Sequence, residues 1–223
     1  MELKTDSKSF FIFDLDDTLF TELDFLKSAY SNISSKLAVP LKVDIYDEMI
    51  HKYQNKENVF AWMIEKYQSH VPFLTFQWLI NEYRDHLPAI SLSEATSSFI
   101  EKAHDLNIPM GLMTDGRSIT QRNKLKALNI ADYFKDIIIS EEFGSEKPDE
   151  RNYLFFLNKY KGMSFCFFGD NTSKDFIVPA RLGWTTICLK NAGHNIHAQS
   201  LTSEPIPDYV VSSFQEINLI KDF

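Results

Sequence analysis

The feature that most constrains this chain is an apolar segment near its start that stops abruptly on acidic residues. Residues 10–13 read Phe-Phe-Ile-Phe and are followed by Asp14, Asp16, Asp17 and Thr18. Four apolar residues without polar alternation are typical of a strand that is covered on both faces, as in a parallel sheet flanked by helices. The acids then lie at the carboxyl end of the strand, where open α/β sheets bind their ligands.

The spacing of the first two acids points to a metal. Asp14 and Asp16 are two residues apart, so they project to the same side if the extended geometry continues. Two carboxylates held that close repel each other unless a cation or a shared proton intervenes. Oxygen ligands of this kind suit Mg²⁺, which combines one or two carboxylates with waters and substrate phosphate. The competing interpretation is a strand followed by an acidic, solvated turn.

Strand and helix patterns alternate along most of the chain. Helical periodicity at 118–128, 149–159 and 173–182 lies between most of the apolar, β-rich segments. This alternation predicts an α/β fold with a doubly wound parallel sheet, of the Rossmann-like kind. The expected strands are 9–13, 109–114, 136–140, 164–169, 185–189 and 208–211.

One stretch, from about residue 21 to 86, contains no convincing strand. It holds four helical windows, punctuated by Pro40, by residues 55–58 and by Pro72. An all-helical block directly after the first strand indicates a cap domain over the site. We therefore expect an α/β core domain at 1–19 and 88–223 and a helical cap domain at 20–87. The windows are 22–37, 43–54, 58–69 and 73–86, and a further helix at 92–106 returns to the core.

Composition limits the partners and the compartment. The formal charge of -8, without a clustered basic stripe, argues against nucleic acid. Residues 1–8 lack the apolar core of a signal peptide, and no apolar run approaches membrane-spanning length. We expect a cytoplasmic protein without membrane association, with Cys166 and Cys188 as buried thiols in predicted strands. His194 and His197 have no nearby acid or cysteine to complete a metal site, so a solvated loop is expected there.

A second polar cluster follows the predicted strand 109–114. The Thr114 hydroxyl can donate to a phosphate oxygen, and the turn at Asp115 and Gly116 can offer backbone N–H groups near a helix start. Asp-Gly is first of all a turn signal, so this cluster is weak evidence alone. Four polar residues of the next helix are interpreted as mostly a solvated face, with the first near enough to reach a ligand: Arg117, Gln121, Arg122 and Lys124.

Two further clusters follow later strands. Lys147 precedes Pro148, which fits the first turn of a helix. A lysine there could hold both a phosphate and the negative charge of Asp14, although a lysine alone is usually exposed. Asp170 closes the strand 164–169 and is well placed to complete the oxygen ligands of a metal. Asp175, five residues on, is expected as a ligand, as a supporting residue or as a helix cap.

These four clusters, in this order, resemble the haloacid dehalogenase-like (HAD) hydrolase superfamily, subfamily I with a helical C1 cap. The resemblance rests on DxDxT at 14–18, the motif II threonine at Thr114, the motif III lysine at Lys147 and GDxxxxD at 169–175. It covers essentially the whole chain, because the helical insert matches the cap between motifs I and II.

The resemblance implies a Mg²⁺-dependent phosphatase, similar to phosphoglycolate phosphatase, that forms an aspartyl-phosphate. Asp14 would attack phosphorus, while Asp16 would protonate the leaving oxygen and later activate water. The metal ligands would be Asp14, the backbone carbonyl of Asp16, and Asp170, with Asp175 in support. The groups that would bind the transferring phosphate are Thr114, Asp115, Gly116 and Lys147.

Alternatives remain open at this point. Asp16 favours a phosphatase over a haloacid dehalogenase, because the founding dehalogenases lack that acid and a halide needs no proton to leave. A phosphomutase shares the same motifs. A non-enzymatic binding protein would be expected to have lost a motif residue. A compact helical cap usually goes with a small phosphorylated metabolite, so we expect a sugar phosphate or phosphoglycolate as substrate, and a monomer or homodimer.

Overall fold

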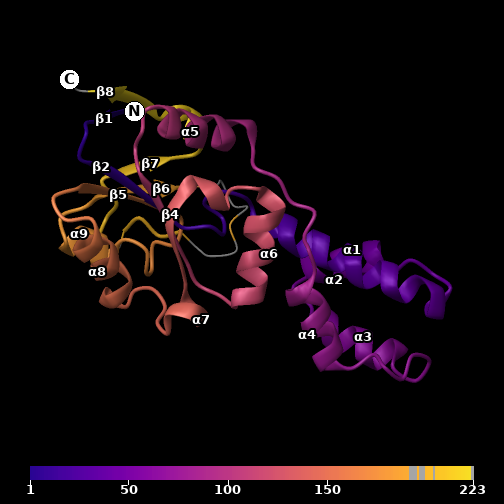
Figure 1. Cartoon of the computed structure of the whole chain (residues 1–223). Coiled ribbons are helices and arrows are strands. Elements are labelled where there is room, and N and C mark those ends of the chain that lie inside the picture. The colour runs from indigo at the N-terminus through magenta and orange to yellow at the C-terminus, as the bar shows by residue number, and fades with distance from the viewer. Residues whose placement is uncertain (191–194, 196–198, 203, 222–223) are drawn as a thin grey trace. The chain divides into compact units, whose positions relative to one another are not determined.

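The computed structural model describes residues 1–190, 195, 199–202 and 204–221 (Figure 1). It divides into two compact units. One consists of Met1–Glu22 together with Ser91–Phe223, and the other of Leu23–Ile90. His194 and His197, considered above as metal ligands, lie outside the described residues.

The first unit is built on a six-stranded sheet whose neighbouring strands all run parallel. The strand order is β4-β3-β2-β5-β6-β7. The prediction of an α/β fold with a parallel sheet is therefore confirmed. The strands are β2 (Ser9–Phe13), β3 (Met110–Thr114), β4 (Phe134–Ile139), β5 (Ser164–Gly169), β6 (Thr185–Leu189) and β7 (Tyr209–Val211).

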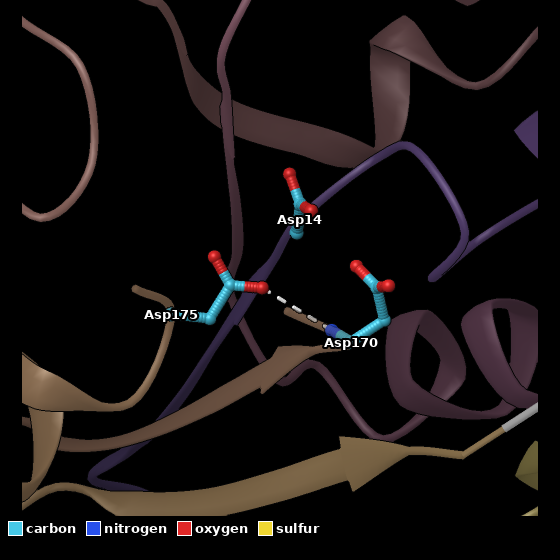
Figure 2. A group of neighbouring side chains, drawn as sticks. All are labelled: Asp14, Asp170 and Asp175. Atoms are coloured by element: carbon cyan, nitrogen blue, oxygen red, sulfur yellow. Dashed lines mark hydrogen bonds between the residues drawn. The ribbon is translucent and has the colours of Figure 1, made fainter. Parts of the chain in front are cut away.

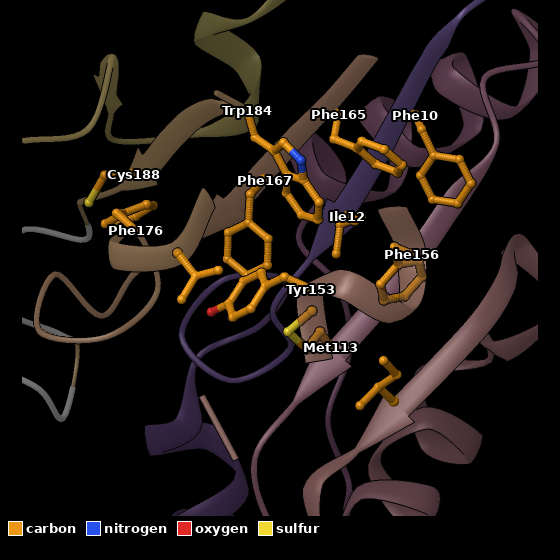
Figure 3. Packing of buried hydrophobic residues seen from close by; sticks show 12 residues of the cluster. Phe10, Ile12, Met113, Tyr153, Phe156, Phe165, Phe167, Phe176, Trp184 and Cys188 are labelled. Carbon is orange, nitrogen blue, oxygen red and sulfur yellow. The ribbon is translucent and has the colours of Figure 1, made fainter. Parts of the chain in front are cut away.

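All five residues of β2 are buried, because helices cover both faces of the sheet. Phe10 and Ile12 belong to a core cluster with α8 (Glu150–Lys159) and α9 (Ile177–Arg181), part of which Figure 3 shows. On the alternate positions, Phe11 and Phe13 pack against Phe99 of α5 (Glu94–Asp105). Successive strand residues thus enter two separate cores, which explains why the sequence of β2 is continuously apolar.

The sheet order places a switch point at β2. From β2 the chain adds β3 and β4 on one side, then returns to add β5, β6 and β7 on the other. Ligands of open α/β sheets bind at the carboxyl ends of strands where this reversal occurs. The carboxyl ends of β2 and β5, which carry Asp14 and Asp170, therefore meet at the expected binding position.

The later helices differ in part from the prediction. The helix expected at 173–182 is only α9 (Ile177–Arg181), because the side chains of Asn171 and Asp175 accept hydrogen bonds from nearby backbone N–H groups and hold the preceding residues in turns. Likewise α8 begins at Glu150 with Asp149 as its N-cap, so Pro148 precedes the helix and is not in its first turn. The remaining elements are α6 (Ser118–Leu128), η1 (Ala131–Tyr133), α7 (Ser140–Phe143) and η2 (Phe214–Glu216).

A second, two-stranded parallel sheet joins the two ends of the first unit. Strand β1 (Glu2–Thr5) pairs with β8 (Asn218–Lys221). The sequence did not predict these strands, because their residues are largely polar and the pairing joins segments more than 200 residues apart. Only Leu3 and Thr5 of β1 are buried.

The second unit is helical and has its own core. Its helices are α1 (Glu22–Leu41), α2 (Tyr46–Gln54), α3 (Val59–Tyr67) and α4 (Phe76–Asp85). Buried side chains such as Ile33, Met49 and Leu79 form the centre of the bundle. Most aromatic residues of the segment are buried in or packed against this cluster, as expected, whereas Phe73 and Phe76 are about half exposed. Pro40 lies inside the last turn of α1 and does not end it. The cap role of this unit stays a prediction.

Two sequence-based expectations concern burial and membranes. Cys166 and Cys188 are both free and buried, as predicted. Within the described residues, no helix has the length and apolar character needed to cross a membrane.

The close packing at Gly111 of β3 can be tested by mutation. A Cβ at this position would lie 2.4 Å from a ring carbon of Phe156, in the middle of the core. We expect Gly111→Ala to lower the free energy of unfolding by about 1–3 kcal/mol, because the ring must shift to relieve the overlap. Urea denaturation followed by circular dichroism would measure this, and an unchanged midpoint would contradict close packing between Gly111 and Phe156.

Candidate active site

Asp14 extends from the carboxyl end of β2 into the switch point of the sheet. Its backbone N–H donates to the carbonyl of Phe168 at 2.8 Å, which continues the pairing with β5. Its side chain is 9% exposed, and Oδ1 lies 2.7 Å from Nζ of Lys147. A nearly buried carboxylate paired with a buried lysine is therefore fixed at the position where the sequence places the nucleophile.

Asp170 and Asp175 complete a group of three buried carboxyls with Asp14 (Figure 2). One carboxylate oxygen from each lies within 4.8 Å of the others. Asp175 Oδ2 accepts hydrogen bonds from the backbone N–H groups of Asp170 at 3.2 Å and Asn171 at 2.9 Å. Asp175 therefore holds the turn that carries Asp170.

Lys147 connects this group to the neighbouring loop. Its Nζ lies 2.7 Å from Asp14 and 2.9 Å from Asp175 Oδ1, and its backbone N–H donates to Asp115 Oδ1. Burial opposes the charged form of Lys147, but the charges of Asp14 and Asp175 raise its pKa well above the ordinary value. Lys147 is thus a buried ammonium group that faces the candidate nucleophile, and not a surface lysine.

The carboxyls are not fully neutralised by this single lysine. Burial raises the pKa of Asp14 well above its usual range, with Lys147 opposing and the charges of Asp175 and Asp170 adding to the effect. Burial and the charge of Asp175 raise the pKa of Asp170 to about 7. A buried group of acids in this condition fits a divalent cation.

Two of the predicted metal ligands, Asp14 and Asp170, offer carboxylates that suit Mg²⁺, and the metal site stays a prediction. Asp14 and Asp170 both line the pocket at the strand ends. Asp175 does not line it, since one of its oxygens faces Lys147 and the other accepts two backbone N–H groups. Of the roles predicted for Asp175, these contacts favour the supporting one.

Thr114 ends β3 next to Asp14 and is almost completely buried. Its Oγ1 accepts a hydrogen bond from Nε2 of Gln121 at 2.6 Å. Because the oxygen accepts from the amide, its own O–H is available as a donor on the pocket side. The geometry is therefore compatible with the predicted contact to a phosphate oxygen.

The turn after Thr114 differs in part from the prediction. The Gly116 N–H donates to Ser140 Oγ at 2.9 Å, and the Ser118 N–H donates to Glu141 Oε2 at 2.8 Å. These two backbone donors are engaged within the protein, which does not favour Gly116 itself as a donor to phosphate, and the predicted role of the turn stays a prediction. Gly116 instead allows the tight turn, with φ of 143°.

Asp115 also has a different role for its side chain. Its Oδ1 accepts from the backbone of Lys147 and its Oδ2 from Nζ of Lys174 at 2.5 Å. A carboxylate that accepts from two cationic residues would repel a phosphate rather than bind it. Asp115 therefore positions the two lysines.

Asp16 points toward α6. Its Oδ1 lies 2.6 Å from Nζ of Lys124, and its Oδ2 accepts from Gln121 at 2.9 Å. Gln121 is 1% exposed and Lys124 is 3% exposed, so the expectation that they belong to a solvated face is wrong. Arg117 is exposed and does not line the pocket.

These side chains surround a small polar pocket of about 120 Å³ within the first unit. The structure adds four lining residues that sequence reasoning did not assign to the site: Asp17, Glu22, Asn171 and Lys174. Asp17 has a positive φ of 53° and its Oδ1 accepts from the Glu22 N–H, as expected for a residue that shapes the turn into α1. Asn195 adds a further contact by donating to Asp170 Oδ2 at 2.8 Å.

Glu22 lines the pocket, but no local sequence signal marks it as a site residue. Glu22 is a helix-start residue by its pattern, and its carboxyl meets the site only because α1 begins beside the strand end. Lys174 lies inside the GDxxxxD stretch, so its position near Asp170 was a usable signal.

Comparison with known proteins agrees with the geometry. Glyceraldehyde 3-phosphate phosphatase of Methanocaldococcus jannaschii is 25% identical over 95% of this chain and 98% of its own length. The protein of the same name from Methanopyrus kandleri is 21% identical over 92% of this chain and 94% of its own.

A similar fold occurs in a solved structure at lower identity. The magnesium-bound HAD hydrolase YfnB of Bacillus subtilis superposes with a TM-score of 0.64 at 18% identity, covering 95% of this chain and 97% of its own. At this identity the likeness supports the fold.

The family model for haloacid dehalogenase-like hydrolases matches residues 11–189, which contain all four predicted motifs and the helical unit between the first and second of them. The chain therefore belongs to the haloacid dehalogenase-like hydrolase family.

Proposed function

We propose that this protein is a Mg²⁺-dependent phosphatase that hydrolyses a small phosphate monoester through an aspartyl-phosphate on Asp14. The observation that carries the proposal is the buried Asp14 carboxylate, 2.7 Å from Lys147, in a pocket that it shares with Asp170 and Thr114. Phosphoryl transfer depends mainly on positioning and charge neutralisation, and these are the groups that supply both. The names of the two phosphatase relatives support the same reaction class.

In the first step, Lys147 and the Thr114 hydroxyl bind oxygens of the phosphoryl group. A carboxylate oxygen of Asp14 attacks phosphorus, the bond to the substrate oxygen breaks, and Asp16 donates a proton to that leaving oxygen. Asp14 and Asp170 would hold Mg²⁺, which when bound neutralises charge on the phosphoryl oxygens. The alcohol product then leaves.

In the second step, Asp16 accepts a proton from a water molecule as that water attacks the phosphorus of the aspartyl-phosphate. The bond between phosphorus and the Asp14 oxygen breaks, which regenerates the carboxylate and releases inorganic phosphate. Asp16 is suited to this exchange because its carboxyl is 20% exposed, whereas Asp14 is almost buried.

The charge of the pocket narrows the substrate class. Six carboxyl residues and two lysines line it, so a bound divalent cation would still leave the site acidic. Glu22 has no hydrogen-bond partner for its carboxyl among the described residues. A carboxylate on the substrate would be repelled, whereas hydroxyl groups could donate to Glu22. Of the two expected classes, this favours a sugar phosphate, such as a triose phosphate, over phosphoglycolate.

The assignment of Asp14 as nucleophile is testable with a panel of phosphorylated metabolites. With Mg²⁺ present we expect release of inorganic phosphate, and loss of activity on the order of 10³-fold or more in Asp14→Asn, because an amide cannot form the acyl phosphate. The matched control is Asp132→Asn, an exposed residue of the same unit, which should retain full activity. Transfer of phosphate back to the sugar without release to water would instead indicate a phosphomutase.

The metal site is testable through thermal stability, independently of turnover. Mg²⁺ should raise the melting temperature of the wild-type protein, since a ligand at 100 times its Kd stabilises the folded state by about 2.7 kcal/mol. Asp170→Asn should abolish this shift. Without metal, the variant should melt no lower than wild type, because the substitution removes a carboxylate that repels its neighbours. A full Mg²⁺ shift in Asp170→Asn would exclude the proposed site.

The role of Glu22 is testable through selectivity and its pH dependence. Burial and the charge of Asp16 raise the pKa of Glu22 to about 7. Glu22 is therefore neutral below that pH and ionised above it, so kcat/KM for phosphoglycolate relative to glyceraldehyde 3-phosphate should fall as pH rises from 6 to 8. Glu22→Gln should raise this ratio at pH 8 by about tenfold and flatten its pH dependence.

The control for this experiment is Glu101→Gln, which removes an exposed carboxylate of the same unit. It should leave both the ratio and its pH dependence unchanged. A Glu22→Gln ratio equal to that of wild type at both pH values would remove Glu22 from the account of specificity.

A further inference from the structure

Helix α6 carries a buried polar face that is unusual for a surface helix. Gln121 and Lys124, three residues apart and therefore on one side of the helix, are 1% and 3% exposed. Lysine is almost never fully buried unless its charge is paired. These two side chains therefore need a reason for their burial, and both meet groups of the candidate active site.

Lys124 contacts Asp16 directly. Its Nζ lies 2.6 Å from Asp16 Oδ1, and the ion pair is shielded on the lysine side and partly open on the carboxylate side. Nζ also lies 5.7 Å from the centre of the Phe20 ring, which packs beside it. The charged end of Lys124 is thus held at one defined position relative to the proposed proton carrier.

Gln121 joins two groups of the site through one amide. Its Nε2 donates to Asp16 Oδ2 at 2.9 Å and to Thr114 Oγ1 at 2.6 Å. An amide nitrogen carries two hydrogens, so both are used. Each oxygen of Asp16 receives one donor from α6, and the Thr114 oxygen is left with its hydrogen free to donate elsewhere.

We propose that Gln121 and Lys124 are positioning residues for the phosphatase reaction. Lys124 fixes the Asp16 carboxyl where it can reach the leaving oxygen, and Gln121 fixes both Asp16 and the direction of the Thr114 hydroxyl. Each carboxylate oxygen has a second acceptor site, so Asp16 can exchange a proton with substrate or water without losing both contacts. This inference rests on the proposed function, because it assigns the two residues to the same reaction.

The proposal makes a prediction that a merely structural role does not. An alkyl phosphate such as glyceraldehyde 3-phosphate needs a proton on its leaving oxygen, whereas 4-nitrophenyl phosphate releases a stable phenolate and needs little assistance. A residue that positions only Asp16 should therefore matter for the first substrate and much less for the second. A residue that merely supports the fold should affect both substrates alike.

The experiment measures kcat/KM for both substrates with Mg²⁺, because this constant reports the phosphoryl-transfer step and not the later hydrolysis of the aspartyl-phosphate. We expect Lys124→Met to lower kcat/KM by about 100-fold for glyceraldehyde 3-phosphate and by less than about 5-fold for 4-nitrophenyl phosphate. Lys124→Arg, which keeps the charge, should recover part of the loss. Lys126→Met is the matched control, since Lys126 is exposed on the same helix, and should equal wild type.

Gln121→Met tests the second contact. Because it disturbs Thr114, which faces the phosphoryl group common to both substrates, we expect kcat/KM to fall about 10-fold or more for both. The two variants should thus differ in pattern: a substrate-dependent loss for Lys124→Met and a general loss for Gln121→Met.

Several outcomes would overturn the proposal. Wild-type kcat/KM in Lys124→Met, or equal losses for both substrates, would remove the positioning role while leaving the phosphatase proposal intact. A wild-type protein inactive on both substrates would instead refute the proposed function, and the inference with it. If Lys124→Met does not fold by circular dichroism, Lys124→Gln, which keeps a polar end, is judged by the same comparison.

Discussion

Three carboxylates and one ammonium group are buried together at the carboxyl ends of β2 and β5, and the rest of the site depends on how their charges balance. Lys147 contacts Asp14 and Asp175, while Asp170 stands beside them and forms no ion pair with a lysine among the described residues. Burial makes each unpaired charge costly, and removing the Lys147 ammonium would leave the three carboxylates uncompensated. A bound divalent cation would supply the missing positive charge at the place where an anionic substrate must also enter.

The fold holds these groups through the backbone as much as through side chains. Asp175 accepts from the N–H groups of Asp170 and Asn171, and Asp115 accepts from the N–H of Lys147. The loops that carry the lysine and the acids are thereby fixed to strand ends whose residues are fully buried. Chemistry that relies on charge neutralisation gains from such fixed groups, because little reorganisation is then needed when the reaction begins.

The sequence predicted the features that local patterns encode. Asp14, Thr114 and Asp170 each stand at the end of an apolar run, so these strand ends could be predicted from the sequence, whereas Lys147 comes several residues after its strand. Lys124 and Gln121 were predicted to lie on a solvated face because polar residues on a helix usually face water. In the structure both side chains are buried and contact the carboxylate of Asp16. The helix at 173–182 was overestimated because its periodicity does not reveal that Asn171 and Asp175 bind the backbone in turns.

The sequence by itself determined the α/β class, the family resemblance and the core of the candidate site. Buried strands that run parallel place their carboxyl ends at one edge of the sheet, so the acids and the threonine that follow them come together there. Only the tertiary structure decided the rest. The β1–β8 pairing and the contacts from α6 to Asp16 join segments far apart in the chain, and the pocket that Glu22 lines is formed by residues of several strand ends. Such contacts depend on how distant segments pack and pair their charges in the folded protein, and a short stretch of sequence does not reveal this.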